Sequence, residues 1–419
     1  MPLIPSTYKP KRPFTNGHLN TIYAAKIRKV KGLSYHRERI DLSDGDFLDI
    51  DFSFAQSKSN STIAIIVHGL EGHAKRPYMQ GTASLLNKQG FDCASINLRG
   101  CSGEDNAKIR SYHSGASEDL SDVVNYILSK NKYKNLFLCG FSLGGNLILK
   151  YLGETRSRPN NIVAAVAVST PVDLYDSLGA LEQRKNWVYR WSFLKDLRKK
   201  YHAKLKVFPK ELSKENYRKI KSLMLFDELY TAPANGFKNA LDYYTKSSSR
   251  QFLPNIKIPT LIINALDDSF LNEKCYPKEE AAQSKNLFLE MPAFGGHVGF
   301  IENQAHTYCE QRTLQFTLLF ALSLILVNCG DDKKKEEKES VKIGANNTSS
   351  TTKKADENVT EVVLLATDMM QFDKKEIRVA AGKKVKLTLR HTGKQPVEVM
   401  GHNFVLLTQG TEIPAFGAK

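Results

Sequence analysis

The stretch from Gly140 to Gly144, which reads GFSLG, limits the fold of this chain more than any other feature. An apolar run at residues 135–139 precedes it, and a run with helical periodicity at residues 145–152 follows it. When a tight turn joins a strand to a helix, a serine at the tip of the turn exposes its hydroxyl for reaction. The residues on either side of such a serine must be small, because the backbone packs too closely there for side chains. The five residues alone are a weak signal. The strand before them and the helix after them favour Ser142 as a nucleophile.

An acid and a base, which such a serine needs, follow it in the chain order typical of this arrangement. Asp267 and Asp268 come directly after a predicted strand at residues 258–265, and His297 follows a second predicted strand. Open α/β sheets place their chemistry beyond the carboxyl ends of strands. We expect His297 to take the serine proton and an aspartate to orient the imidazole ring of His297. Asp268 is preferred to Asp267 because the acid usually stands three positions after a small residue, here Ala265. There is also an interpretation without catalysis: the two aspartates would be ordinary turn residues at the end of a strand, and the histidine an ordinary loop residue.

Backbone N–H donors for a tetrahedral oxyanion are the third requirement. The amide of Leu143, directly after Ser142, is one expected donor. The segment at residues 65–72 offers the other, because a His-Gly turn follows a buried strand there and places the amide of Leu70 after the turn. His68 could be mistaken for the base, and we interpret it as a residue that shapes this turn.

Short motifs are spread over the first 317 residues: NGHLNTI at 16–22, HGLEG at 68–72, NLRGCSGE at 97–104, YHSG at 112–115, GFSLGGN at 140–146, ALDD at 265–268 and GGHVGF at 295–300. Together they resemble the YheT-like branch of the α/β hydrolases, related to the eukaryotic abhydrolase-domain lipases and the yeast medium-chain ester synthases. The resemblance implies a serine hydrolase of short- to medium-chain or lipid-like carboxylic esters, with acyl transfer to alcohols as a related activity. It implies no metal or organic cofactor. Ser269 departs from the family, which often has proline after the acid, and this changes loop stiffness rather than chemistry.

The hydrolase part, residues 1–317, is expected to have an α/β fold with a mostly parallel sheet and helices on both faces, because strand-like and helix-like stretches alternate from Ile63 to His297. Residues 37–54 predict a hairpin before that region. Residues 176 to about 250 interrupt the alternation with a helical pattern rich in aromatic and basic side chains. We expect them to form a lid over an acyl pocket.

A formal net charge of +16 has three interpretations. It can be a solvated surface, or it can attract an anionic lipid or membrane surface with help from the aromatic lid. Binding of nucleic acid is not expected, since no recognition motif accompanies the charge. The expected partner is a small-molecule or lipid ester. Cys93, Cys101 and Cys139 lie in or beside predicted buried strands without a C-x-x-C pair, which favours reduced thiols and a cytoplasmic hydrolase.

The sequence changes character after residue 317. Residues 318–330 are largely apolar up to Cys329; they resemble the core and cleavage box of an exported bacterial lipoprotein leader and are too few to span a membrane comfortably. Residues 331–360, rich in lysine and glutamate, are expected to be a disordered tether. The alternative is that residues 313–327 are simply the final helix of the hydrolase, and the two interpretations overlap in part.

Residues 361–419 show an alternation that predicts antiparallel strands of a partial β-sandwich. Motifs at 370–372, 389–393 and 399–406 resemble the N-terminal part of azurin, a blue-copper cupredoxin, in which His402 would be a vestigial copper ligand. A blue-copper site needs a second histidine and a cysteine, which this fragment lacks, so we expect an incomplete site.

Two other functions are alternatives to the esterase. One is a membrane-tethered periplasmic electron-transfer protein, which the missing copper ligands disfavour. The other is a tethered binding protein without chemistry, which the intact serine, aspartate and histidine disfavour. Our hypothesis for the tail is that two neighbouring reading frames have been joined and the second cut short.

Overall fold

The computed structural model describes residues 3–56, 60–154, 158–302, 306–328, 359–366 and 384–391. The chain divides into two compact units, Met1–Asp332 and Lys333–Lys419. Each unit is described by itself.

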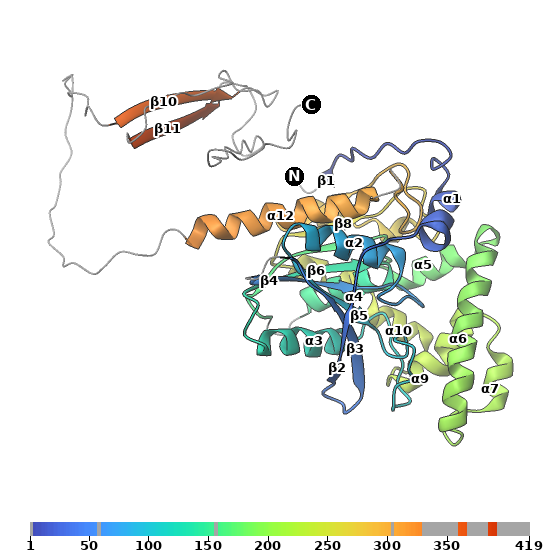
Figure 1. The fold of residues 1–419 in the computed structure, drawn as a ribbon. Helices are drawn as coiled ribbons and strands as arrows, with labels where there is room; N and C mark the ends of the chain where they lie inside the picture. The colour runs from blue at the N-terminus through green and yellow to red at the C-terminus, as the bar shows by residue number, and fades with distance from the viewer. Residues whose placement is uncertain are drawn as a thin grey trace, which may run out of the picture. The chain divides into compact units, whose positions relative to one another are not determined.

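A nine-stranded sheet forms the centre of the first unit, with the strand order β1-β9-β8-β7-β6-β4-β5-β3-β2 (Figure 1). The strands are β1 Leu3–Ile4, β2 His36–Asp41, β3 Phe47–Ser53, β4 Thr62–Val67, β5 Asp92–Asn97, β6 Asn135–Phe141, β7 Ile162–Val168, β8 Thr260–Ile263 and β9 Leu287–Glu290. Pairing is antiparallel only for β3 with β2 and with β5. The remaining pairs are parallel, which confirms the predicted mostly parallel sheet, and β2 with β3 is the predicted hairpin.

Helices cover both faces of this sheet. Outside the region between β7 and β8 they are α1 Gly17–Ile22, the π-helical η1 Tyr23–Ile27, α2 Pro77–Lys88, α3 Ser117–Ser129, α4 Leu143–Gly153, the 3₁₀ turn η5 Glu273–Cys275, α11 Lys278–Gln283 and α12 Tyr308–Asn328. Strand β4 illustrates why both faces are covered by helices. Successive side chains of a strand point to opposite sides of the sheet, and those of β4 are apolar on both sides. Ile63 and Ile65 join the core beneath α3 and α4, and Ile66 joins the core beneath α2 and α12.

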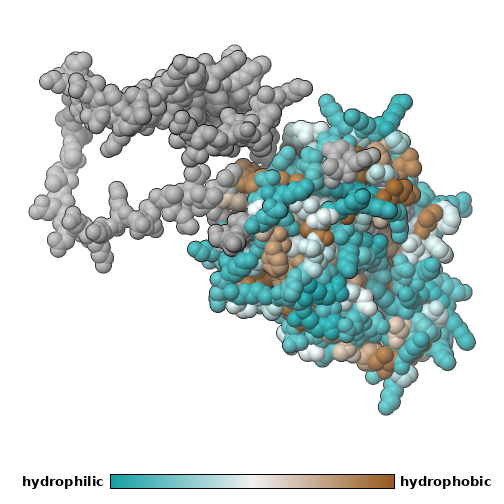
Figure 2. All heavy atoms as spheres, viewed as in Figure 1, coloured by the Kyte–Doolittle hydropathy of each residue, from teal (hydrophilic) through white to brown (hydrophobic). Residues whose placement is uncertain are grey.

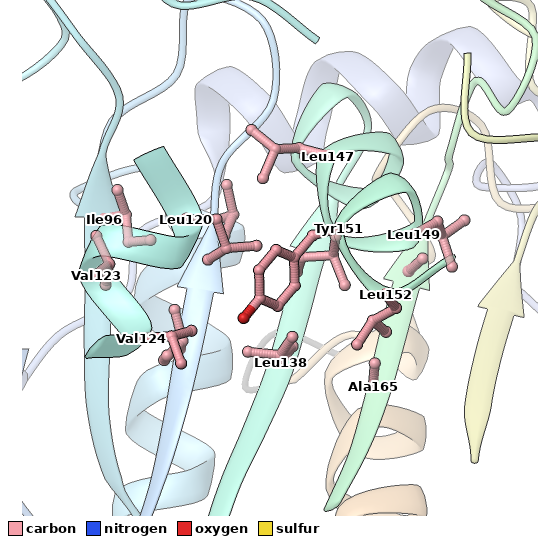
Figure 3. Packing of buried hydrophobic residues seen from close by; sticks show 14 of the residues in the cluster. Ile96, Leu120, Val123, Val124, Leu138, Leu147, Leu149, Tyr151, Leu152 and Ala165 are labelled. Atoms are coloured by element: carbon pink, nitrogen blue, oxygen red, sulfur yellow. The ribbon is translucent and has the colours of Figure 1, made fainter. Parts of the chain in front are cut away.

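Helix α4, which begins directly after Ser142, is fixed by a buried cluster (Figure 3). Tyr151 lies among Leu138 of β6 and Leu120 and Val124 of α3, and its side chain is almost wholly buried. Truncating a buried leucine in such a cluster costs about 2–5 kcal/mol of unfolding free energy. The turn that carries Ser142 is therefore anchored by the helix that follows it.

The region between β7 and β8 forms a separate helical layer with its own apolar core. Its elements are α5 Leu174–Leu181, η2 Arg184–Asn186, α6 Trp187–Val207, α7 Lys214–Lys219, α8 Leu223–Phe226, η3 Asp227–Thr231, α9 Ala232–Ala234, α10 Ala240–Ser247 and η4 Arg250–Asn255. Figure 1 shows α6 and α7 side by side at the edge of the molecule. We call residues 174–255 the lid.

Helix α12 crosses residue 317, the boundary that the sequence suggested. Glu310 in its first turn forms a buried bidentate pair with Arg28, at 2.8 Å between Nη2 and Oε2. Arg312 donates to Glu290 of β9 at 2.8 Å, and Phe316 is buried against the sheet. The first half of α12 is thus packed as the final helix of the α/β fold, the second of the two interpretations above. Within the described residues, no helix is both long and apolar enough to cross a membrane.

The second unit contains two described strands, β10 Val359–Ala366 and β11 Lys384–His391. They pair in parallel, so the expectation of antiparallel strands is wrong for this pair. Parallel pairing has the same side-chain alternation as antiparallel pairing, which is why the sequence pattern could not separate them. His402, Cys329 and the tether up to residue 358 lie outside the described residues, and the partial β-sandwich stays a prediction.

Candidate active site

Ser142 stands between β6 and α4 with φ 52° and ψ −120°, a conformation that residues with a side chain rarely adopt. Its amide donates to Val168 O of the neighbouring strand at 2.8 Å, which holds the strained residue in place. Strain of this kind costs about 1–3 kcal/mol and persists where the surrounding structure fixes it.

The two glycines of the motif are required by close backbone contacts. A Cβ on Gly140 would lie 2.4 Å from Gly144 O, and one on Gly144 would lie 2.4 Å from Val67 O. Real Cβ atoms do not approach so closely, because van der Waals repulsion forbids it. The spacing of the motif thus reflects the packing of β6, α4 and β4 around the serine.

The structure brings together Ser142, His297 and Asp268. Ser142 Oγ lies 2.9 Å from His297 Nε2, and His297 Nδ1 lies 2.8 Å from Asp268 Oδ2. The Asp268 side chain is fully buried and that of His297 is 11% exposed. The three side chains come from three different strand ends, after β6, β8 and β9.

The two neighbouring carboxylates have different partners. Asp268 accepts a second hydrogen bond from the Phe270 amide at 2.9 Å, so both of its oxygens are occupied. Asp267 accepts from the Gly296 amide at 2.8 Å and does not face the imidazole. Burial raises the pKa of Asp267 above its usual value. The Phe270 ring stacks on the His297 ring at 4.2 Å between centroids.

The loop of His297 rests on the N-terminal helix α1, which the sequence reasoning did not assign to the site. The His297 amide donates to Thr21 Oγ1 at 2.7 Å, and Thr21 Oγ1 donates to Gly17 O at 2.7 Å. Gly296 has φ 58°, and a Cβ there would lie 2.2 Å from Gly17 O. The only available signal was the family-like motif at 16–22.

The amides of Leu70 and Leu143 lie beside Ser142. Leu143 follows it directly, and a Cβ on Gly69 would lie 2.9 Å from Ser142 Cβ, so the turn before Leu70 contacts the serine. Among the hydrogen bonds of the described residues, neither amide donates to a protein acceptor. Both are therefore free to receive a negatively charged oxygen.

His68 is fully buried, and both of its ring nitrogens are occupied. The Leu98 amide donates to Nε2 at 3.1 Å, so Nδ1 carries the proton and donates to Gly69 O at 2.7 Å. Burial lowers the pKa of His68 to about 3, which keeps the ring neutral. In a trans peptide the C=O and N–H groups point in opposite directions. By holding the Gly69 carbonyl, His68 turns the Leu70 amide away from itself.

Two cavities meet at Ser142, Leu70, Phe193, Phe270 and His297. The first, which we call the acyl cavity, has a volume of about 130 Å³ and extends beneath the lid. Its apolar lining is Leu174, Leu178, Leu181, Leu197, Leu223 and Phe226. The second, the entrance cavity, has a volume of about 440 Å³ and lies between α1, η1 and the start of α6.

A family model described as the alpha/beta hydrolase fold matches residues 64–304, more than half of the chain. The chain belongs to the α/β-hydrolase family. YheT of Escherichia coli K12 is 33% identical to this hydrolase over 296 residues, which are 70% of this chain and 86% of YheT.

Two human relatives extend the comparison. Phospholipase ABHD3 is 29% identical over 326 residues, 75% of this chain and 79% of ABHD3. Monoacylglycerol lipase ABHD2 is 26% identical over 325 residues, 72% of this chain and 76% of ABHD2. The relatives support a hydrolase function of the esterase and lipase type.

The lid of the hydrolase contacts the turn of Leu70 through Glu71, a second feature that sequence reasoning missed. Glu71 has φ 51°, and its carboxylate accepts from Tyr112 Oη at 2.6 Å and from Lys200 Nζ of α6 at 2.9 Å. Lys200 Nζ also lies 3.1 Å from Cys101 Sγ. Arg76 donates to Glu71 O at 2.7 Å. Glu71, which directly follows Leu70, is thus held through both its side chain and its backbone carbonyl.

Ser269 stands at the position where the family often has proline. Its hydroxyl donates to Asn186 Oδ1 at 2.7 Å, and Asn186 Nδ2 donates to Ser269 O at 2.6 Å. These bonds connect the loop of Asp268 to the residue before α6. In the described part of the hydrolase no cluster of three or more histidine, cysteine or acidic side chains is arranged to hold a metal ion. The five cysteines described there are free thiols.

Proposed function

We propose that this chain is a serine hydrolase that cleaves carboxylic esters through an acyl-enzyme on Ser142. One observation carries the proposal: the continuous hydrogen-bonded series from Ser142 Oγ through His297 to Asp268, with distances of 2.9 and 2.8 Å. A serine hydroxyl is a weak nucleophile at neutral pH, and a neighbouring imidazole held in one tautomer activates it.

In the first half of the proposed reaction, Ser142 Oγ attacks the ester carbonyl carbon as its proton moves to His297 Nε2. The carbonyl oxygen becomes an oxyanion that the Leu70 and Leu143 amides stabilise. The C–O bond to the alcohol then breaks, and His297 gives its proton to the leaving oxygen. Asp268 keeps Nδ1–H directed toward itself and stabilises the imidazolium.

In the second half, an acceptor hydroxyl attacks the acyl-enzyme while His297 takes its proton. The second tetrahedral intermediate collapses, the bond to Ser142 Oγ breaks, and the proton returns to the serine. Water as the acceptor gives the free acid. An alcohol gives a new ester, which is the acyl-transfer reaction that the resemblance implies.

The substrate is an ester with an apolar acyl chain, of the lipid-like class. The acyl cavity, with its leucine lining, favours an alkyl chain. The entrance cavity includes Lys26, Arg76 and Asp196, so it suits the polar alcohol part. The names of ABHD3 and ABHD2, a phospholipase and a monoacylglycerol lipase, agree with this class.

A panel of p-nitrophenyl esters from acetate to palmitate tests the proposal. We expect turnover with an optimum above acetate, and a loss of at least about 10⁴ in kcat for Ser142→Ala with an unchanged folded state. Ser142→Ala at the wild-type rate would contradict the nucleophile, and a preference for acetate would contradict the acyl cavity.

A further inference from the structure

Five large apolar side chains surround the entrance cavity and remain exposed. Leu19 and Ile22 of α1 are 48% and 41% exposed, and Trp187, Val188 and Trp191 of α6 are 62%, 47% and 61% exposed. We call these five residues the entrance rim. In the view of Figure 2 most of the surface is hydrophilic, and hydrophobic residues show in several places, among them the region near α1.

The entrance rim belongs to one continuous site. Ile22, Val188 and Trp191 line the entrance cavity together with Ser142 and His297. The two helices are joined through His18 and Tyr189, whose Nδ1 and Oη atoms lie 3.1 Å apart and whose rings stack. An apolar surface around the mouth of a cavity indicates a place of contact with a partner.

The rim has the chemistry of a lipid interface. Trp187 and Trp191 are both of the tryptophans in the chain. Tryptophan prefers the boundary between water and lipid, because its ring is apolar and its N–H needs a polar partner.

Positive charge accompanies these apolar side chains. Four basic side chains are exposed on α6 or on the turns directly beside α1 and α6: Lys26 of η1, Arg184 and Lys185 of η2, and Lys195 of α6. Lys195 Nζ lies 5.3 Å from the centre of the Trp191 ring. The whole chain carries +16. Aromatic and basic side chains together complement a surface of anionic headgroups rather than a neutral one. Glu182, the acidic residue just before this segment, pairs with Arg190 at 3.4 Å.

We infer that the entrance rim docks on the surface of an anionic phospholipid bilayer, with α1 and the first turns of α6 against the headgroups. Docking places the entrance cavity at the membrane, so that a lipid ester reaches Ser142 without crossing water. The use of docking for catalysis rests on the proposed function, whereas the docking itself does not.

Tryptophan fluorescence of the full chain measures docking directly, since both tryptophans belong to the rim. We expect phosphatidylglycerol vesicles to shift the emission to shorter wavelength, and brominated lipid to quench it. Phosphatidylcholine vesicles should have a much smaller effect. No shift with phosphatidylglycerol, or an equal shift with both lipids, would overturn the inference.

Matched variants locate the surface by co-sedimentation with phosphatidylglycerol vesicles. Leu19→Ser with Trp187→Ser changes rim residues that line neither the acyl cavity nor the entrance cavity, and Trp191 remains as the fluorescent reporter. We expect at least roughly tenfold weaker binding, and a similar loss for Arg184→Glu with Lys185→Glu. Leu241→Ser on α10, where leucine is 55% exposed and lines another cavity, is the control and should bind as wild type. Equal binding by rim and control variants would contradict the assignment.

Hydrolysis of a water-soluble butyrate ester separates this inference from the proposed function. The Leu19→Ser, Trp187→Ser variant should retain it and lose activity on ester embedded in vesicles. Wild type that cleaves the soluble ester without binding vesicles would overturn docking alone. Wild type that binds vesicles without cleaving any ester would overturn the proposed reaction alone.

Discussion

Ser142 keeps a strained backbone because both sides of its turn are fixed, by the Val168 hydrogen bond and by the contacts that admit only glycine at 140 and 144. The strain directs Oγ toward His297, at the end of another strand. Asp268 completes the series with both of its oxygens occupied. The proposed chemistry depends on two hydrogen bonds, of 2.9 Å from Ser142 Oγ to His297 Nε2 and of 2.8 Å from His297 Nδ1 to Asp268 Oδ2.

Replacing either aspartate by asparagine should separate their roles. Asp268→Asn leaves an amide beside Nδ1 and favours the wrong imidazole tautomer, so we expect kcat to fall by on the order of 10³–10⁴. Asp267→Asn can still accept from the Gly296 amide and should lose less than about tenfold. Steady-state kinetics on a butyrate ester measures both, and equal losses would sink the assignment.

The three residues of the proposed triad could be expected from the sequence because each lies in a short recognisable motif. A glycine on each side of Ser142, a small residue three before Asp268 and two glycines before His297 lie next to these residues in the sequence. The contacts that require Gly144 and Gly296, with Val67 O and Gly17 O, form only in the folded chain. Thr21 and Phe270 could not be expected, since they meet His297 only through the tertiary fold. Threonine and phenylalanine carry no pattern that would single them out.

At the scale of elements, helix α6 connects the lid to the turn of the Leu70 amide. Lys200 reaches from α6 to Glu71, and Tyr112 holds the same carboxylate. The sequence predicted a helical lid from its composition, but a single lysine in a basic stretch gave no sign of this contact. The same holds for α1, whose small residues Gly17 and Thr21 support the loop of His297.

Lys200→Met should loosen the turn that positions the Leu70 amide. Loss of a whole oxyanion donor costs about 10²–10³ in kcat, so a displaced donor should cost roughly tenfold, with Lys200→Arg restoring part of it. Lys199→Met, which removes a neighbouring exposed lysine, is the control. If Lys200→Met raised KM at unchanged kcat, Lys200 would act only on the acyl cavity that it lines.

At the scale of the whole molecule, the first half of α12 packs against the sheet of the hydrolase unit. A chain ending at Asn328 keeps the Arg28–Glu310 pair and should cleave esters within about twofold of the full chain. A chain ending at residue 306 leaves Arg28 buried without Glu310, which costs about 3–5 kcal/mol, and should fail to fold. Circular dichroism and ester turnover check both. A folded but inactive chain ending at Asn328 would show that the tail takes part in the reaction.

Two buried histidines should make stability depend on pH. Burial lowers the pKa of His68 to about 3 and of His113 to about 4, against about 6.5 in an unfolded chain. Below pH 6.5 these two histidines therefore bind protons in the unfolded chain but stay neutral in the folded chain. The free energy of unfolding consequently falls as the pH falls toward 4. At pH 5 each histidine should cost about 2 kcal/mol.

Urea unfolding at pH 7.5 and pH 5 tests this sign. His113→Asn keeps an acceptor for the Gly115 amide and should reduce the loss between the two pH values by about 2 kcal/mol. An identical loss in the variant and the wild type would show that His113 is not the group that titrates.

The sequence also suggested a leader, a tether and an azurin-like fragment after residue 317. The described strands β10 and β11 pair in parallel, and no observation on His402 or Cys329 bears on that interpretation. Long-range pairing in such a segment depends on partners distant in the chain, which periodicity does not reveal. The joined reading frames stay a hypothesis.

Reaction of the full chain with a fluorophosphonate, followed by mass spectrometry, tests the central claim most directly. The oxygen of a serine activated by a neighbouring base attacks the phosphorus of such a probe and displaces fluoride, which leaves a stable adduct on that serine. We expect one adduct per chain, on the peptide that contains Ser142, and none in Ser142→Ala or after heat denaturation. An adduct on another serine, or a folded chain that takes no adduct, would contradict the account.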